Sequence, residues 1–249
     1  MTTRRKVLQG LTLAAPTLLL GCDRLSQSPS FRDLLKTGDW LSYRVQRLIG
    51  SDALAREFAP SEMSPVFRTN GNTMPGSADY QRHLTTQFAD WRLQVTGLVE
   101  APAALSLADL RAMPTRTQIT RHDCVEGWSA IGKWTGTPLG AVLEQARLKP
   151  AARYIVFHCA DDFYGTPYYE SIDLADALHP QTILAYGMND APLPTGHGAP
   201  IRVRIERQLG YKSAKFIMGV EAVSDLSGFG KGEGGFWEDV AFYDWYAGI

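Results

Sequence analysis

Short strand patterns and short helix signals alternate between Trp91 and Val223 in no regular order. Runs of alternating or clustered apolar residues, typical of strands, occur at 91–97, 119–123, 154–158, 201–206 and 216–223. Helix signals stand between them at 106–113, 137–146 and 171–177, where Ser106 begins a capping-box-like sequence and Thr137 precedes Pro138. Helices and strands in this irregular order predict a mixed α+β fold in a single domain.

The regions on either side of this core have patterns of their own. Apolar residues in 31–58 recur at helical spacing, which predicts amphipathic helices there. Residues 60–79 are rich in Pro, Gly, Ser and Asn, and we interpret them as a long irregular loop, a kind of segment that is usually functional. The aromatic, glycine-rich stretch 228–249 has two interpretations: a tail pinned across the domain, or a docking surface or pocket rim.

The first 22 residues have the layout of an export signal. A basic stretch precedes an apolar run at 7–20, which is too short to span a bilayer. Arg4 and Arg5 resemble a twin-arginine signal, and residues 19–22 resemble a lipobox, in which Cys22 is the lipidated residue. The alternative to the lipobox is ordinary cleavage beside an incidental cysteine.

This layout predicts a signal at 1–21, a polar tether at 22–30 and a domain at 31–249, in a periplasmic protein anchored to the membrane as a lipoprotein.

The net charge of the chain argues against a nucleic-acid-binding protein. Three basic residues are the only charged ones among the first 21, so the rest of the chain is more acidic than its overall net charge of −1. A nucleic-acid binder that relies on phosphate contacts needs a basic surface, so nucleic acid is not an expected partner.

The chain has three cysteines, Cys22, Cys124 and Cys159, and none of them has the spacing of a metal clip or a haem attachment site. Structural zinc, iron–sulfur clusters and c-type haem are therefore not expected. If Cys22 carries a lipid, two thiols remain in an oxidising compartment. A Cys124–Cys159 disulfide is then one expectation.

The most informative stretch surrounds Cys124, in Arg-His-Asp-Cys-Val-Glu-Gly-Trp-Ser at 121–129. Cys124 stands at the end of a predicted strand, before a turn that contains Gly127 and after two potential cations, Arg121 and His122. Cations near a thiol lower its pKa and favour the thiolate, which is the form that binds a metal. An inert buried cysteine, or half of a disulfide, is the alternative.

A second stretch, 193–215, combines glycine-rich turns with Arg202, Lys212 and Lys215. Such turns leave backbone N–H groups open to an anion, and the Arg and Lys side chains supply positive charge. This combination suits a ligand that carries a phosphate, although it has the glycine spacing of neither a Walker nor a dinucleotide motif. A basic surface hairpin is the alternative interpretation.

Together the two stretches resemble the molybdopterin-binding oxidoreductase domain of the sulfite oxidase superfamily, and more closely its exported bacterial branch, which includes the protein-methionine-sulfoxide reductases. The motifs that carry the resemblance are Arg-x-x-Cys-Val-Glu-Gly-Trp-Ser, Gly-Ala-Pro-x-Arg and Gly-Tyr-Lys-Ser-x-Lys. The best match covers residues 67–224. The resemblance implies a sulfite-oxidase-like fold and a molybdenum–molybdopterin cofactor.

By the same resemblance, Cys124 matches the catalytic cysteine that ligates molybdenum. Cys159 stands where this branch commonly has Thr, and His197 stands where it often has Asn and sulfite oxidases have His. Arg202 and the segment 213–215 match the residues that hold the cofactor phosphate. The cofactor-binding residues implied in this way are Asn70, Asn72, Cys124, Cys159, His197, Arg202, Ser213, Ala214 and Lys215. His122 is a further candidate for a residue that hydrogen-bonds near the metal.

The predicted activity is molybdenum-dependent oxo transfer to or from a small sulfur or nitrogen compound or a protein methionine sulfoxide. Two alternatives remain: a sulfite-oxidase-type enzyme, and a non-catalytic binding lipoprotein that kept the fold. The sulfite-oxidase alternative is weakened because the cysteine motif lacks an arginine-rich flank. Because the chain has no haem motif, electrons are expected to pass through a separate partner, either a haem protein or a quinone-linked membrane subunit.

Overall fold

The computed structural model describes residues 28–50 and 52–249, and the chain divides into two compact units between Ser51 and Asp52. The first unit contributes helix α2 (Pro29–Gly50), so the amphipathic helices predicted over 31–58 form a single helix that ends at Gly50, and residues 53–58 are not helical. Its Leu34, Leu41 and Leu48 are exposed, and no helix in the described part of the chain is long and apolar enough to cross a membrane. The predicted signal and Cys22 lie outside the described residues, and the predicted domain boundaries stay predictions.

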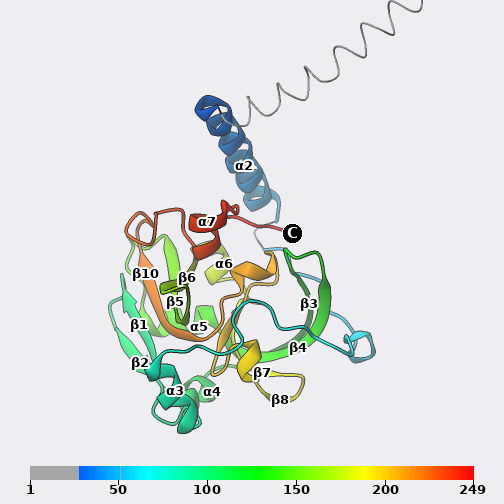
Figure 1. Ribbon diagram of the computed structural model, residues 1–249, viewed down its shortest axis with the longest axis vertical. Coiled ribbons are helices and arrows are strands. Elements are labelled where there is room, and N and C mark those ends of the chain that lie inside the picture. The colour runs from blue at the N-terminus through cyan, green and yellow to red at the C-terminus, as the bar shows by residue number, and fades with distance from the viewer. Residues whose placement is uncertain (1–27, 51) are drawn as a thin grey trace, which may run out of the picture. The chain divides into compact units, whose positions relative to one another are not determined.

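Two sheets form the second unit, as Figure 1 shows. The first has the strand order β2–β1–β10–β5–β6, made of Ala103–Leu105, Leu93–Gly97, Ile217–Val223, Tyr154–Phe163 and Thr166–Asp173. The second contains β3 (Arg116–Asp123), β4 (Ser129–Pro138), β7 (Ile183–Met188) and β8 (Ala191–Pro192), and β9 (Arg202–Arg204) also pairs with β7. Among the described strands only β1 and β10 pair in parallel, so the sheets are largely antiparallel.

Short helices connect these strands and confirm the mixed α+β class. They are α3 (Ala78–Thr85), α4 (Leu107–Ala112), α5 (Leu139–Ala146), α6 (Leu174–Ala177) and α7 (Phe236–Ala241), with 3₁₀ turns η1 (Pro60–Glu62), η2 (Thr195–His197) and η3 (Gly210–Lys212). The predicted capping box opens α4, where the Ser106 side chain accepts from the Asp109 N–H and the Asp109 carboxylate accepts from the Ser106 N–H.

The main core is built around α5, whose apolar residues recur at spacings of three and four and so lie on one face. Leu139, Val142 and Leu143 are each at most 1% exposed, and burying such a side chain contributes about 1.5–3 kcal/mol. They belong to one cluster with Ile155 of the first sheet and Val203 of the second. This shared core fixes the two sheets against each other, and with them the loops that carry the site.

Three further predicted elements, all in the second unit, differ from the structure. The helix predicted at 171–177 is wrong over its first three residues, because β6 continues to Asp173 in register with β5 and only α6 follows. Thr137 does not cap α5: it lies in β4, and its hydroxyl donates to the Leu110 carbonyl at 2.6 Å. The strand predicted at 201–206 shortens to β9. In each case pairing between distant segments overrides the local signal.

Candidate functional site

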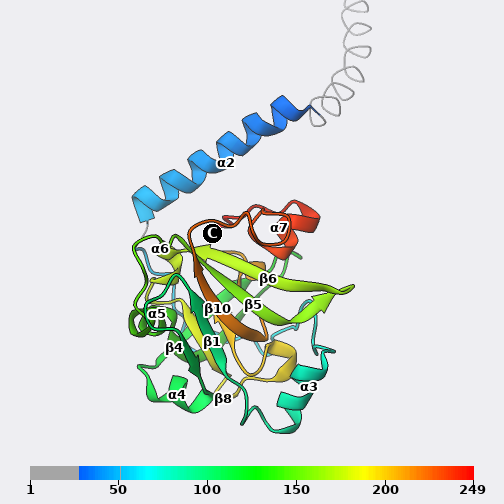
Figure 2. The ribbon, with the colours of Figure 1, turned by 90° about the vertical axis from the view of Figure 1, so that its left-hand side faces the viewer.

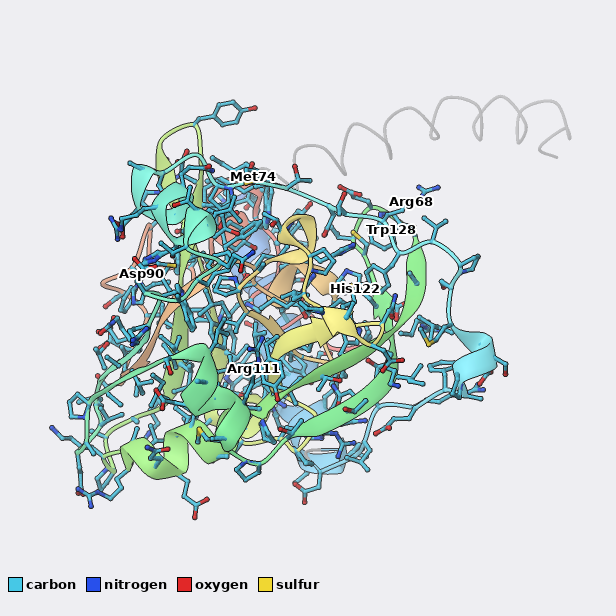
Figure 3. All side chains as sticks on the ribbon, turned by 90° about the horizontal axis from the view of Figure 1, so that it is seen from below. Arg68, Met74, Asp90, Arg111, His122 and Trp128 are labelled. Atoms are coloured by element: carbon cyan, nitrogen blue, oxygen red, sulfur yellow. The ribbon has the colours of Figure 1, made fainter. Side chains whose placement is uncertain are left out.

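Cys124 lies directly after β3, in the tight turn that leads into β4. Its N–H donates to the Trp128 carbonyl at 2.9 Å, and the Gly127 N–H donates to the Cys124 carbonyl at 2.9 Å. Gly127 has φ +85°, a left-handed conformation that glycine adopts without strain. Figure 3 shows the labelled His122 and Trp128 side chains near each other at this end of β3 and β4, with Arg68 beside them.

The expectation that neighbouring cations lower the thiol pKa is wrong. Burial raises the pKa of Cys124, and the Glu126 carboxylate acts in the same direction. Arg121 is bound to Asp123, with 2.9 Å between Nε and Oδ2. Burial also holds the pKa of His122 well below its usual range, so His122 carries no charge near neutral pH. A thiolate at Cys124 therefore needs a bound cation rather than a neighbouring side chain.

Cys124 faces a partly open cavity of about 220 Å³, which is lined by residues of both sheets and of the C-terminal segment. Seven of the nine predicted cofactor-binding residues line this cavity. They are Asn70, Asn72, Cys124, Arg202, Ser213, Ala214 and Lys215. Their positions in the sequence span about 145 residues, so the fold brings them together from four separate segments.

Arg202, the first residue of β9, supplies one buried cation of the cavity. Its guanidinium donates to the His197 carbonyl at 3.1 Å and to the Ser213 carbonyl at 2.8 Å, and its Nε has no partner among the described residues. Burial and the neighbouring Arg204 lower the pKa of Arg202 to about 9. A buried guanidinium that lacks an acidic partner is built to receive an anion.

Lys215 supplies the second cation. Its ammonium donates to the carbonyls of Asn70 at 2.7 Å and Gly196 at 3.2 Å, and also to the carbonyl of Asn72. Burial and the charge of Arg202 lower the pKa of Lys215 to about 7. Like Arg202, Lys215 has no carboxylate within ion-pairing distance among the described residues.

The segment Ser213–Lys215 adds backbone donors to these cations. The Ala214 carbonyl accepts from the Val203 N–H at 3.0 Å, which aligns the segment along β9. In the described part of the chain, the N–H groups of Ala214 and Lys215 have no backbone partner. Two cations and two open N–H groups form a site that fits a phosphate. These residues therefore fit the phosphate end of a molybdopterin, and the Cys124 thiol fits a metal bound to it.

Asn70 connects the two parts of the site. Its side-chain amide donates to the Cys124 Sγ at 3.7 Å, while its carbonyl accepts from Lys215. The Asn72 amide donates to the Asp162 carbonyl at 2.7 Å and reaches the Asp161 carboxylate at 3.4 Å. The predicted irregular loop at 60–79 is thus functional in the sense that it delivers both asparagines to the cavity.

Two predicted residues do not line the cavity. Cys159 packs against the main core, and Asp161, two residues further along β5, lines the cavity instead. His197 touches the site only through its carbonyl, which Arg202 binds, while its ring packs on Phe67 at 5.7 Å between centroids. Both Cys124 and Cys159 are free thiols, so the disulfide alternative is not formed.

Several residues of the cavity were not predicted from the sequence. Asp161 is 5% exposed, and burial raises its pKa to about 6. Its Oδ1 has no partner in the described residues, so it stands as a ready acceptor for N–H groups of a ligand. Aromatic side chains form another part of the lining: Phe163, Tyr168, Tyr211, Trp237 and Tyr243. Trp237 and Tyr243 belong to the stretch 228–249 and confirm that this stretch contributes to a pocket rim.

A known protein family matches the part of the chain that contains most of the two sheets and the residues from Cys124 to Lys215. It is described as the oxidoreductase molybdopterin binding domain; it matches residues 81–228, and the chain belongs to it. The protein is therefore a molybdopterin-dependent oxidoreductase, which agrees with the phosphate site and the single cysteine of the cavity.

Comparison with individual proteins places the chain near two kinds of relative. A protein of Azospira oryzae, provisionally named protein-methionine-sulfoxide reductase subunit YedZ1, is 36% identical over 253 residues, which is 100% of this chain and 88% of that protein. The catalytic subunit MsrP of protein-methionine-sulfoxide reductase from Xanthomonas campestris is 35% identical over 153 residues, which is 57% of this chain and 48% of that protein.

The fold has a solved counterpart as well. The sulfane dehydrogenase SoxCD from Paracoccus pantotrophus matches with a TM-score of 0.51 and 22% identity, over 55% of this chain and 39% of that one. This match confirms the predicted sulfite-oxidase-like α+β fold.

Proposed function

We propose that this protein uses molybdenum bound by the Cys124 thiolate to transfer an oxo group to or from a small sulfur or nitrogen compound or a protein methionine sulfoxide. The observation that carries the proposal is that the Cys124 thiol and the phosphate site of Arg202, Lys215 and 213–215 face one cavity. The similarity to MsrP favours sulfoxide reduction within this class.

A bound molybdenum–molybdopterin supplies two-electron redox chemistry coupled to movement of an oxo group. In sulfoxide reduction the substrate takes up two electrons and two protons and becomes a thioether and water. The chain's own residues hold the phosphate, orient the thiolate through Asn70 and shape the cavity in which the cofactor and substrate meet. The electrons come from a separate partner, either a haem protein or a quinone-linked membrane subunit.

Export and membrane attachment are part of the same proposal. The twin arginines suit a route that carries folded, cofactor-loaded protein into the periplasm, and lipid on Cys22 would hold it at the membrane. The exposed leucines of α2 support a role of this helix near a membrane or a membrane subunit. Labelled fatty acid incorporated into the wild-type protein and absent from Cys22→Ala supports the anchor. Absence from both contradicts it.

The cysteines provide the sharpest test of the chemistry. Cys124→Ser should abolish activity and change the Mo(V) paramagnetic resonance spectrum, while pterin stays bound through Arg202 and Lys215. Molybdenum content, pterin content and the spectrum are measured on the same purified samples. A Cys124→Ser variant with an unchanged spectrum and full activity contradicts the proposal.

Cys159→Ser is the matched control, because Cys159 packs in the core and not in the cavity. It should keep molybdenum and activity and lose only modest stability. If the two cysteines formed a disulfide instead, both variants would destabilise alike, by about 2–5 kcal/mol. Denaturant midpoints of both variants separate the two cases.

A further inference from the structure

The C-terminal segment, residues 229–249, brings aromatic side chains to the cavity from outside the family match. The oxidoreductase molybdopterin binding domain ends at residue 228, yet Trp237 of α7 and Tyr243 just after it line the cavity. Figure 2 shows α7 along the same edge of the molecule as the hairpin of β5 and β6. This segment therefore adds a surface to a cavity whose thiol and phosphate site are supplied by other residues.

A buried ion network holds the segment in place. Lys212 donates to Glu238 of α7 at 2.6 Å and to Glu170 of β6 at 2.5 Å, and all three side chains are at most 2% exposed. Next to it, Asp239 accepts from the Tyr169 hydroxyl at 2.6 Å and from the Lys231 N–H at 3.0 Å. Because the bonds of Lys212 to Glu238 and of Tyr169 to Asp239 are buried, they fix α7, and the position of Trp237 is fixed with it.

Four rings from three parts of the chain form one aromatic wall of the cavity: Phe163, Tyr211, Trp237 and Tyr243. The Trp237 ring lies 5.3 Å from Phe163 and 5.9 Å from Tyr243 between centroids, and Tyr243 lies 5.0 Å from Tyr211. Phe163, Trp237 and Tyr243 are half-buried, so part of each ring stays open to a ligand. A rigid arrangement of partly open rings is typical of a binding surface rather than of core packing.

The chemistry of the aromatic wall differs from that of the phosphate site. The wall presents ring surfaces with no charged side chain of its own, so it suits an apolar or polarisable group and not an anion. Thioether sulfur and the alkyl groups attached to it make favourable contacts with aromatic rings at about 5 Å. Among substrates of the proposed class, alkyl sulfoxides and thioethers carry such a group.

We propose that the aromatic wall, through Trp237 and Tyr243, binds the alkyl-sulfur part of a sulfoxide or thioether substrate and so selects this substrate class. The inference rests on the proposed function for the reaction itself. It assigns to the C-terminal segment the recognition of substrate, while Arg202, Lys215 and Cys124 hold the cofactor.

The test compares Trp237→Leu and Tyr243→Leu with Phe242→Leu in the cofactor-loaded enzyme, with a reduced viologen dye as electron donor and methionine sulfoxide as substrate. Phe242 is the matched control, because it lies between the two in sequence, is 89% exposed and does not line the cavity. Trp237→Leu should raise KM about tenfold with kcat, molybdenum and pterin content unchanged, and Tyr243→Leu should act in the same direction. Phe242→Leu should leave all four quantities unchanged.

Two results would overturn the assignment: unchanged KM in both wall variants, or loss of pterin from folded wall variants, which would place the wall against the cofactor. Thioether binding is measured separately, by titrating the loaded enzyme with N-acetylmethionine methyl ester and following tryptophan fluorescence. If the wild type binds the ester and Tyr243→Leu does not, the result supports the binding role of the aromatic wall. If the enzyme also reduces no sulfoxide, only the proposed reaction fails. Equal binding by both proteins contradicts the wall.

Discussion

Lys212 and Lys215 stand three residues apart, and the fold gives them opposite surroundings. The Lys212 ammonium is fully buried between the carboxylates of Glu170 and Glu238, which raise its pKa against the effect of burial. Lys215 is 9% exposed, and its ammonium contacts only carbonyl oxygens. The pKa of Lys215 falls to about 7. Two neighbouring cations of the same motif therefore have different tasks.

The difference shows how one short segment can serve both the fold and a ligand. Lys212 is neutralised inside the protein, so its charge attaches η3 to β6 and α7. Lys215 is left without an acidic partner, beside Arg202 and the open N–H groups of 214–215, so its charge is available to the phosphate of a cofactor. Stability and cofactor binding are thus assigned to different lysines of one motif.

Loss of Lys212 should have the largest effect. Lys212→Met leaves the Glu170 and Glu238 carboxylates buried side by side without a cation, and removing one partner of a buried ion pair costs about 3–5 kcal/mol. The free energy of unfolding, measured with denaturant on the apoprotein, should fall by that amount. Adding Glu238→Gln to Lys212→Met should recover part of the loss. A fully stable Lys212→Met would contradict a structural task for this residue.

Loss of Lys215 should reduce cofactor content more than stability. Lys215→Met removes a charge-assisted contact to phosphate, which corresponds to a loss of about tenfold in affinity. Three carbonyls lose a donor, but the repulsion from Arg202 is relieved, so the apoprotein should lose less than about 2 kcal/mol. Pterin content after dialysis and the denaturant midpoint are the measurements. Full pterin retention with a large loss of stability would reverse the roles of the two lysines.

The sequence predicts the local part of this site and misses the long-range part. The turn at Cys124, the capping box of α4 and the apolar face of α5 are encoded within a few residues, and the structure confirms them. The two lysines look alike in sequence because the partners of Lys212 are 42 and 26 residues away. A signal within Gly-Tyr-Lys-Ser-x-Lys cannot tell which lysine meets a carboxylate.

Two expectations about the cysteines depend on tertiary packing. The family resemblance implies a cofactor role for Cys159, but the Cys159 side chain packs against the main core, and Asp161 lines the cavity instead. Arg121 was expected to activate Cys124, but Asp123 binds it. Strand register and the choice among nearby charged partners are set by tertiary packing, which local patterns do not contain.

Anion binding to the apoprotein should depend on pH through Lys215. Its pKa of about 7 means that the ammonium is charged below pH 7 and neutral above it, so sulfate affinity should fall by about tenfold as the pH rises through 7. Asp161, with a pKa of about 6, adds negative charge over the same range and acts in the same direction. Calorimetric titration with sulfate, which stays a dianion, checks this.

Lys215→Met should flatten this sulfate profile, while Lys149→Met, an exposed lysine far from the motif in sequence, should leave it unchanged. A profile that keeps its slope in Lys215→Met would assign the pH dependence to another group and remove the main electrostatic difference between the two lysines.

The smallest effect is expected for Glu170→Gln, and it tests how the Lys212 network is charged. Two carboxylates around one ammonium leave one negative charge in excess, and burial raises the pKa of Glu170 well above its usual range. Because Gln keeps the shape of a protonated Glu and still accepts from Lys212, the free energy of unfolding should change by less than about 1 kcal/mol at neutral pH. Denaturant unfolding of Glu170→Gln beside Lys212→Met gives the comparison directly. If both variants lose the same stability, the network needs Glu170 and Glu238 both ionised. Lys212 would then be held by two charged carboxylates, and not by one carboxylate and one hydrogen bond to a neutral group.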